Sequence, residues 1–346
     1  MIDRYGNRLD MRERVHAVSA RVGRTIAEEV SPHVVELNFD PGPAQDFWRD
    51  YVVLQRDFFR ACQGEGIEPL PFGLVPFANE EAARRRLRES VTSHPSMHYR
   101  WLVERDGLDT LASLEGMCGL QVHVERQNGE NAVVTARTLA YCVPLFAGLA
   151  ASSPIRDGRY AANASERIGI KLGMPLSGIP QAPALRDLAS VRAHLDASAR
   201  TLRSVSPGYY FVRLPRVELA TIENCTMDMV PDLSIASILM HLHVLISDRV
   251  AEAMLLGEPL PSHIFGSGML EGGDRACIMR QIDGVLRSPR LFDAMIETHG
   301  GDRILFREYL REVVLWARGD AVFLSSIDSM LYAGTVSERI VRTLGL

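Results

Sequence analysis

The sequence is poor in cysteine, and it lacks any uninterrupted hydrophobic run long enough to span a membrane. Its five cysteines are odd in number and scattered without a CxxC pair, a usage typical of proteins in a reducing cytoplasm. The most apolar stretch, about Pro231 to Leu256, is interrupted by charged side chains and histidines, so we expect a core helix there. Charged residues between Arg4 and Arg14 argue against a signal peptide. We therefore expect a cytoplasmic protein with no membrane partner.

The sequence also lacks an excess of basic residues. Its net charge of -5 argues against nucleic acid as the main partner, because phosphate backbones favour basic surfaces. The basic run Arg84 to Arg88 follows Glu80 and Glu81 and is typical of a solvated helix face, with an anion-binding or partner-binding patch as the alternative. A chain of 346 residues, 47% hydrophobic and 23% charged, can bury one large core. We expect a single domain over residues 1–346.

Apolar residues at helical spacing predict the main helices. An aromatic stripe over Ala44 to Cys62 indicates an amphipathic helix that packs on the core. A second helix over about Asn131 to Ser152 contains Pro144, which should kink it. In the C-terminal region we expect helices over Asp302 to Arg318 and Ser337 to Leu344.

Three short segments carry alternating polar and apolar residues. The polar members are Glu36 and Asn38 in the first segment, Gln121, His123 and Glu125 in the second, and Thr221, Glu223 and Cys225 in the third. Alternation with a period of two predicts strands with one polar and one apolar face. A strand at the solvent-exposed edge of a sheet would show the same pattern, so alternation alone does not indicate a function.

The polar residues gain a chemical meaning if the three strands share one sheet. Its open face then gathers Glu36, Gln121, His123 and Glu223, while the apolar face rests on helices. These oxygen and nitrogen groups can hold a divalent cation. Mg²⁺ takes carboxylate oxygens and keeps several waters, which leaves room for a phosphate-bearing substrate. The pattern points to nucleotide chemistry without a glycine-rich phosphate loop.

Four segments occur in the order and spacing of the glutamate-cysteine ligase type 2 family, also called the carboxylate-amine ligases. They are CGLQVHV at 118–124, LFAGLAASSP at 145–154, SER at 165–167 and TIENCTMD at 221–228. The resemblance spans about Glu28 to Ala251 and is weak from Ser262 onward. It implies an α+β, glutamine synthetase-like fold, in which a curved antiparallel sheet binds ATP and Mg²⁺ on its concave face and carries helices on its convex face. Residues 262–346 are then expected to form a helical cap.

The same resemblance implies roles for individual residues. The implied metal ligands are Glu36, His123 and Glu223; the implied substrate-binding or nucleotide-binding residues are Gln121, Ser165, Arg167 and Thr221; the implied catalytic residues are Arg167 and Arg213. Gln121 stands where many members carry the first histidine of a His-Val-His-Val strand. Both arginines are expected to neutralise charge on the transferred phosphoryl group, because a planar fork of donors suits phosphate.

The sequence also departs from the family pattern. Members usually open with a Gly-x-Glu-x-Glu strand, and nothing like it precedes Glu28. Residues 1–27 are a divergent N-terminal segment, in which Met1 to Arg24 predict a turn at Tyr5 to Asn7 and a charged helix instead. Cys225 replaces an arginine, GLVP at 73–76 replaces Gly-Thr-His-Pro, and IFGSGM at 264–269 replaces an arginine-bearing helix start. Each change removes a polar contact from the expected pocket. A missing first strand also exposes a sheet edge, which makes a homodimer an expectation.

The resemblance implies an ATP-dependent ligase that converts an amino-acid carboxylate, glutamate or a similar acid, into an acyl phosphate that an amine attacks. Two alternatives remain open. One is an enzyme of specialised metabolism on the same scaffold with altered or ATP-independent chemistry, and the other is a non-catalytic relative that binds a ligand or partner. Cys225 has two readings as well: a nucleophile with His123 as its base, or a buried and inert thiol.

Overall fold

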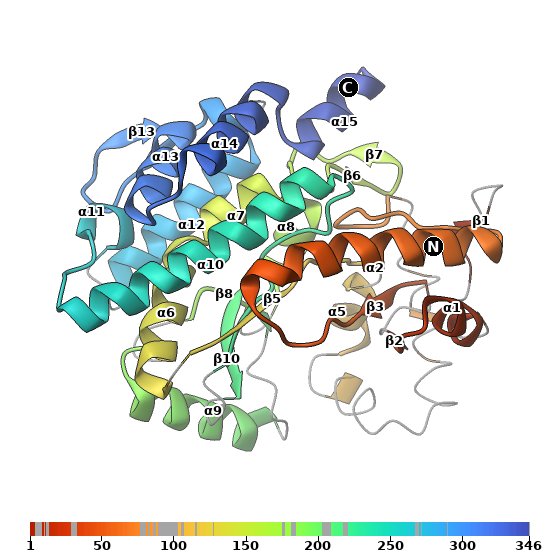
Figure 1. The fold of residues 1–346 in the computed structure, drawn as a ribbon, viewed down its shortest axis with the longest axis horizontal. Helices are drawn as coiled ribbons and strands as arrows, with labels where there is room; N and C mark the ends of the chain where they lie inside the picture. Colours follow the sequence, from red (N-terminus) through yellow and green to blue (C-terminus); the bar gives the residue numbers. More distant parts are fainter. Residues whose placement is uncertain are drawn as a thin grey trace. The chain divides into compact units, whose positions relative to one another are not determined.

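Figure 1 shows the fold of a computed structural model, which describes the chain except residues 4–8, 10, 12–13, 29–32, 77–80, 82–83, 86–87, 89–102, 105–106, 115, 127, 175–176, 181–184, 203–208, 217–220, 267–269, 271, 289 and 346. The chain forms two compact units, Met1–Cys118 and Gly119–Leu346, called unit 1 and unit 2. Each unit has buried apolar residues of its own. The expectation of one domain over the whole chain stays a prediction.

Unit 1 is built from one long helix and several short elements. They are β1 (Ile2–Asp3), α1 (Val15–Val22), β2 (Ile26–Glu28), β3 (Val35–Leu37), α2 (Ala44–Gly64), β4 (Ile67–Glu68) and α5 (Leu108–Ser113). β1 pairs with β4 and β2 pairs with β3, both antiparallel. Val15 and Val18 of α1 pack with Phe58 of α2 in a shared apolar core. The predicted amphipathic helix over Ala44 to Cys62 is confirmed in α2.

The N-terminal segment contains a strand that the sequence analysis missed. The Gly-x-Glu-x-Glu motif is absent from the sequence, but β2 precedes β3 and pairs with it, Ala27 opposite Glu36. No Gly-x-Glu-x-Glu motif precedes Glu28 in the sequence, as expected, and β2 is a strand that was not predicted. Three residues are too few for a period of two to stand out from chance. The expected charged helix is α1, the expected turn at Tyr5 to Asn7 lies outside the described residues, and the homodimer stays a prediction.

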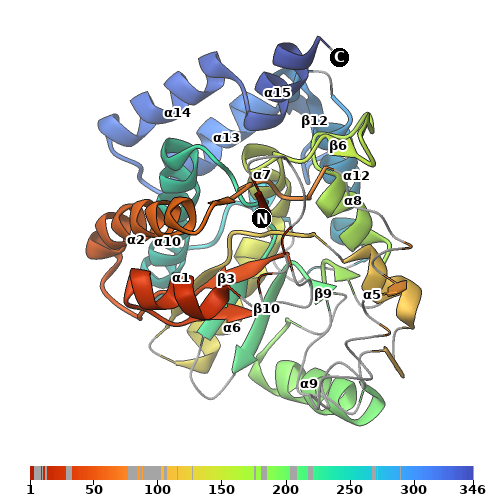
Figure 2. The same ribbon diagram turned by 90° about the vertical axis from the view of Figure 1, so that its right-hand side faces the viewer.

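Unit 2 holds a three-stranded antiparallel sheet in the order β10-β11-β5. Its strands are β5 (Val122–Glu125), β10 (Val212–Arg216) and β11 (Thr221–Asn224). Val122, Val124 and Ile222 are buried, and the helices α6 (Gly129–Tyr141) and α10 (Leu233–Leu256) pack against these strands (Figure 2). Alternate residues project to the opposite face. The predicted pattern of one polar face and one helix-covered face is confirmed for β5 and β11, while β10 is a neighbouring strand that the pattern did not predict.

The central helices of unit 2 are strongly apolar. The predicted kink is confirmed, because α6 is followed by α7 (Val143–Leu149) at an angle of 55°, with Pro144 in the first turn of α7, where a missing N–H leaves no bond unmade. By length and composition α10 can cross a membrane, as can the bent pair α6–α7, and 56% of the apolar window of α10 is buried within the chain. Since α10 packs on α6, α7 and β5, it occupies the core position predicted for Pro231 to Leu256.

The remaining elements of unit 2 are short strands and the C-terminal helices. They are β6 (Ile155–Arg156), β7 (Arg159–Tyr160), α8 (Glu166–Leu172), β8 (Ser177–Gly178), α9 (Leu188–Leu202), β9 (Tyr209–Tyr210), α11 (Ser262–Phe265), α12 (Gly272–Leu286), the 3-10 helix η3 (Leu291–Asp293), β12 (Met295–Glu297), β13 (Arg303–Leu305), α13 (Phe306–Trp316), α14 (Ala321–Ala333) and α15 (Val336–Leu344). The helix expected over Asp302 to Arg318 therefore begins later, because Arg303 to Leu305 pair with β12 in a hairpin. Helical spacing within the segment carries no information on that partner.

The α+β class is confirmed in its coarse form, as a mostly helical chain with small sheets. The single curved sheet is not found among the described residues. β3, which carries Glu36, pairs with β2 in unit 1, whereas His123 and Glu223 share the sheet of unit 2. Alternation fixes the face on which a residue lies, but it does not identify the neighbouring strand. That is why the sequence pattern predicted a wider sheet than the structure contains.

Candidate functional site

Three side chains lie in one line across the sheet of unit 2. On β10, Arg213 is the register partner of Glu223 on β11, and Glu223 is in turn the partner of His123 on β5. Directly opposed residues of antiparallel strands project from the same face. Arg213, Glu223 and His123 therefore form a continuous polar line, which we call the sheet row.

Arg213 and Glu223 hold each other in a two-pronged ion pair. Nε and Nη2 of Arg213 donate to Oε2 and Oε1 of Glu223 at 2.7 and 2.5 Å. Burial lowers the pKa of Arg213, but the Cys225 thiol and the Glu223 carboxylate together raise it above its ordinary value. The guanidinium is therefore charged, and the planar match to the carboxylate fixes its direction.

The β5 end of the sheet row is open to solvent. His123 and Glu125 are exposed, while the valines that alternate with them are buried. Gln121, two residues before His123, is exposed as well, and Thr221 on β11 is half-buried opposite Glu125. A ligand that approaches the polar face meets these β5 side chains. The structure thus brings together His123, Glu223 and Arg213 and leaves Gln121 and Thr221 on neighbouring positions.

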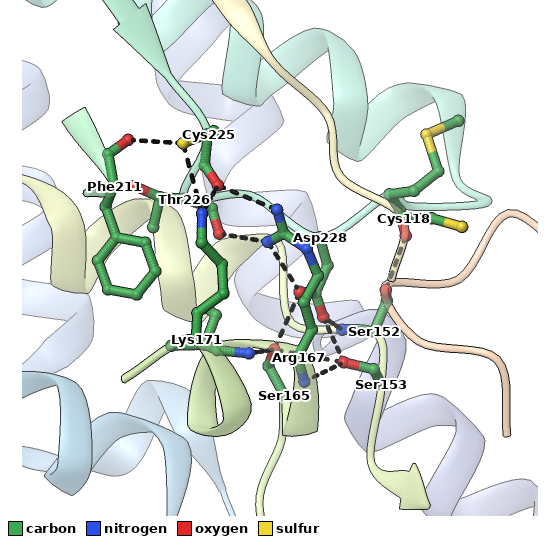
Figure 3. Close-up of polar contacts among 12 residues, drawn as sticks. Cys118, Ser152, Ser153, Ser165, Arg167, Lys171, Phe211, Cys225, Thr226 and Asp228 are labelled. Carbon is green, nitrogen blue, oxygen red and sulfur yellow. Dashed lines mark hydrogen bonds and ion pairs between the residues drawn. The ribbon is translucent and has the colours of Figure 1, made fainter. Parts of the chain in front are cut away.

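A second group of polar residues is buried where the chain leaves β11 (Figure 3). Asp228 has no exposed surface. Its Oδ2 accepts hydrogen bonds from the Ser152 N–H at 3.1 Å and the Ser153 hydroxyl at 2.7 Å, and its Oδ1 accepts one from the Ser165 hydroxyl at 2.9 Å. Burial raises the pKa of Asp228, against the lowering effect of Arg167 and of these hydrogen bonds. We call Ser152, Ser153, Ser165, Arg167 and Asp228 the Asp228 cluster.

The guanidinium of Arg167 is bonded to backbone carbonyls of its own chain. Nη1 donates to the Thr226 carbonyl and Nη2 to the Cys225 carbonyl, each at 3.0 Å, and Nη1 lies 3.6 Å from Oδ1 of Asp228. Gly119 makes room for it, because a Cβ at that position would clash with Nη2. Arg167 therefore supports the loop that follows β11. Its predicted contact with a phosphate or carboxylate, and that of Ser165, stay predictions.

Lys171 is the only lysine in the sequence, and the sequence analysis passed over it. Its Nζ donates to the Cys225 carbonyl at 3.2 Å, lies 3.4 Å from the Cys225 Sγ, and sits 5.0 Å from the centre of the Phe211 ring. Burial above all lowers the pKa of Lys171 to about 8, although the neighbouring thiol raises it. The composition could have drawn attention to Lys171. Of the 38 lysine and arginine side chains, 37 are arginines, which stay charged in proteins, whereas a buried lysine can lose its proton.

The thiol of Cys225 is enclosed by the chain. It is 4% exposed, and its Sγ donates to the Tyr210 carbonyl at 3.1 Å. The residue opposite His123 on the neighbouring strand is Glu223, two positions before Cys225. This arrangement favours the buried, inert reading of Cys225 over a nucleophile with His123 as base.

The described residues of unit 2 do not by themselves fit a magnesium ion. Both oxygens of Glu223 are bonded to Arg213, whose positive charge opposes a divalent cation at the same carboxylate. In the part of the chain that the structure describes, no three histidine, cysteine, aspartate or glutamate side chains gather closely enough to hold a metal. Glu36, the third predicted ligand, lies on β3 of unit 1. Metal ligation by Glu36, His123 and Glu223 stays a prediction.

Comparison with known proteins gives one family match. A family model described as glutamate-cysteine ligase family 2 (GCS2) matches residues 6–263. The matched segment contains the whole sheet row and the whole Asp228 cluster, and it ends before α12.

Individual relatives agree with this match. One in Pseudomonas paraeruginosa is 31% identical over 253 residues, which cover 70% of this chain and 61% of the relative. One in Pseudomonas aeruginosa is 32% identical over 166 residues, 46% of this chain and 41% of the relative. One in Rubrobacter xylanophilus is 30% identical over 203 residues, 58% and 52% of the two chains. The first two are named "Putative glutamate–cysteine ligase 2" and the third "Putative glutamate–cysteine ligase 2-3"; the match spans less than two thirds of each.

Proposed function

This chain belongs to glutamate-cysteine ligase family 2, and on that premise we propose that it is a carboxylate-amine ligase that uses ATP to join an amino-acid carboxylate to an amine. The relatives' names support glutamate as the acid to try first and cysteine as the first amine. The proposal places the activity in the cytoplasm. It concerns the sheet of unit 2 and the residues around it.

The sheet row is the observation that carries the proposal. It combines the charged guanidinium of Arg213 on β10, which Glu223 holds in a fixed orientation, with the exposed imidazole of His123 on β5. β11 lies between these two strands. The row lies on the face of the sheet away from the buried valines and isoleucine, within the segment that matches the family. A fixed cation and an exposed proton acceptor on the same face of one sheet suit a reaction in which negative charge develops and a proton is lost.

The proposed reaction has two steps. A carboxylate oxygen of the acid attacks the γ-phosphorus of ATP, the bond to the ADP oxygen breaks, and an acyl phosphate forms. The amine nitrogen then attacks the acyl carbon, phosphate leaves with the bonding electrons, and the nitrogen loses a proton. Arg213 stabilises charge on the transferred phosphoryl group, since Glu223 already holds it in place and no reorganisation is needed. His123 accepts the proton from the amine.

The remaining predicted residues take supporting places in this proposal. Gln121 and Thr221 contact the substrate or nucleotide at the open end of the sheet row, where Gln121 is exposed and Thr221 half-buried. Mg²⁺ accompanies ATP in the family expectation, but because the described residues of unit 2 do not fit it, no step is assigned to a metal. Arg167 acts by supporting the loop after β11.

The proposal is tested by measuring ADP released by the full-length protein across a panel of amino acids and amines, with and without Mg²⁺. We expect ADP release that needs both an acid and an amine, together with an amide product whose mass equals the two substrates minus water. ADP formation no faster than the uncatalysed rate with every pair would refute the ligase.

One observation favours a second candidate, a relative that binds its ligands without joining them. Arg167 and Glu223, two residues expected to contact phosphate or metal, both have partners within the chain. In that case calorimetry detects binding of glutamate or ATP while no ADP forms. Running calorimetry beside the ADP assay separates the two candidates.

A further inference from the structure

A cavity of about 680 Å³ lies among the C-terminal helices of unit 2. Its walls come from β7, η3, α13, α14 and α15. None of its lining residues belongs to the sheet row or the Asp228 cluster. Apart from Tyr160 and Ala164, the lining residues lie within 288–342, beyond the family match to residues 6–263. The size is ordinary for a small-molecule site.

Seven of the sixteen residues that line this C-terminal cavity are charged. The arginines are Arg290, Arg307, Arg311 and Arg342, and the acids are Asp293, Asp328 and Glu338. The formal charge of the lining is therefore positive by one unit. How these charges are paired decides which of them can meet a ligand.

All three acids are committed to partners in the chain. Asp293 pairs with Arg307, and Asp328 lies 2.6 Å from Nη2 of Arg311. Glu338 accepts hydrogen bonds from two backbone N–H groups, those of Leu291 at 2.9 Å and Thr335 at 2.7 Å.

The other two arginines have no such partner. Among the residues that the structure describes, neither Arg290 nor Arg342 forms an ion pair with a carboxylate, and both are exposed. Two guanidinium groups that line one cavity attract an anion, and each can bond its oxygens in pairs. This part of the cavity is suited to phosphate or carboxylate.

Two tyrosines add a second kind of surface. Tyr160 is 42% and Tyr332 95% exposed, although both line the cavity. The exposed surface of a tyrosine ring offers a flat face on which a planar group can stack.

We propose that the C-terminal cavity binds a small organic anion that carries a planar ring. Its phosphate or carboxylate group lies on Arg290 and Arg342, and its ring stacks on Tyr332 and Tyr160. The site is independent of the proposed ligase activity, since it shares no residue with the sheet row.

Calorimetry on the full-length protein tests the proposal with three probes: phenyl phosphate, benzoate and inorganic phosphate. We expect phenyl phosphate or benzoate to bind at least about tenfold more tightly than inorganic phosphate, because the ring adds stacking energy. The tighter of the two ring-bearing probes identifies the anionic group as phosphate or carboxylate.

Variants then locate the binding. We expect the double change Arg290→Gln with Arg342→Gln to weaken the tighter probe by about tenfold or more, and Tyr332→Ala to weaken it by roughly threefold to tenfold. Arg192→Gln, at an exposed position of α9 outside the cavity, is the matched control and should bind like the parent. All four positions are exposed, so a melting curve is expected to show each variant folded.

Two results would overturn the proposal. One is no detectable binding of either ring-bearing probe up to about 10 mM. The other is equal affinity in the parent and the double arginine variant, which would place any binding elsewhere on the chain.

Discussion

Arg167 and Arg213 each face a carboxylate close to β11, but Arg213 is the more exposed of the two. The side chains of Arg167 and Asp228 are 6% and 0% exposed, whereas those of Arg213 and Glu223 are 23% and 5% exposed. Arg167 also donates to two backbone carbonyls. Arg213 lies in a row that ends at the exposed His123.

This difference separates a structural pair from a candidate catalytic pair. The Asp228 cluster joins Ser152 and Ser153, Ser165 of the α8 N-terminus and the loop after β11, so it holds the strand end that carries Glu223. The sheet row instead presents charge toward a side from which a substrate can approach. If the comparison is right, changes in the Asp228 cluster reduce stability, and changes at the open end of the sheet row reduce activity alone.

The largest effect on stability is expected for Asp228→Ala. It removes the counter-charge of a buried arginine and leaves the Ser152 N–H without its acceptor. We expect the free energy of unfolding to fall by about 3–5 kcal/mol, measured by urea denaturation. The control Asp283→Ala breaks an exposed pair with Arg287 and should change stability by less than about 0.5 kcal/mol. Equal losses in the two variants would contradict a supporting role for the cluster.

The pH dependence of stability tests the buried environment that Lys171 shares with Arg167 and Arg213. The positive charges of both arginines lower the pKa of Lys171. In the folded state its pKa is about 8, against 10.5 for an unperturbed lysine. Between these values the unfolded chain binds more protons than the folded one, so Lys171 makes stability rise with pH across this window.

We expect the parent to gain roughly 2–3 kcal/mol over the variant Lys171→Met between about pH 8 and pH 10.5. Urea denaturation of both proteins at several pH values measures the difference. Parallel pH profiles for the two proteins would show that Lys171 titrates at its ordinary value and is not held in a desolvated position.

The space around Arg167 is tested by Gly119→Ala. The added methyl group meets Nη2 of Arg167 and the Met227 carbonyl, so we expect a loss of about 1–3 kcal/mol in the free energy of unfolding. Gly273→Ala is the control, because a Cβ there meets nothing within 4 Å, and it should leave stability unchanged or slightly improved. A tolerated Gly119→Ala would mean that Arg167 is free to move away.

A smaller effect is expected for Arg167→Lys. The charge near Asp228 remains, but one ammonium cannot replace the planar fork that reaches the Cys225 and Thr226 carbonyls together. We expect a loss of about 1–2 kcal/mol in stability and a substantial loss of ADP release. Unchanged denaturation and unchanged turnover together would show that neither carbonyl bond matters.

Local alternation was enough to predict the faces of the strands, but it could not predict the partners. His123 and Glu223 were expected on one polar face, and they are register partners. Glu36 fits the same pattern, yet it pairs within unit 1, because a period of two does not identify the neighbouring strand. The kink at Pro144 followed from proline chemistry alone and is confirmed.

The contacts that sequence reasoning missed are those made over long separations. Lys171 meets Cys225 across 54 residues, and Asp228 meets Ser153 across 75. Hydrophobic periodicity describes only residues within one helix or strand, so it cannot predict a buried partner that is distant in the sequence. The resemblance implied a phosphate or carboxylate contact for Arg167, which stays a prediction, while its bonds to backbone carbonyls emerged only from the fold.

The most direct test of the comparison is His123→Ala, assayed for ADP release and stability beside the control His16→Ala, another exposed histidine. The account predicts that both variants unfold within about 0.5 kcal/mol of the parent, and that ADP release falls roughly 100-fold or more in His123→Ala alone, as expected for loss of a proton acceptor. Unchanged ADP release in His123→Ala, with the parent active, would contradict the assignment of the sheet row as the site of chemistry.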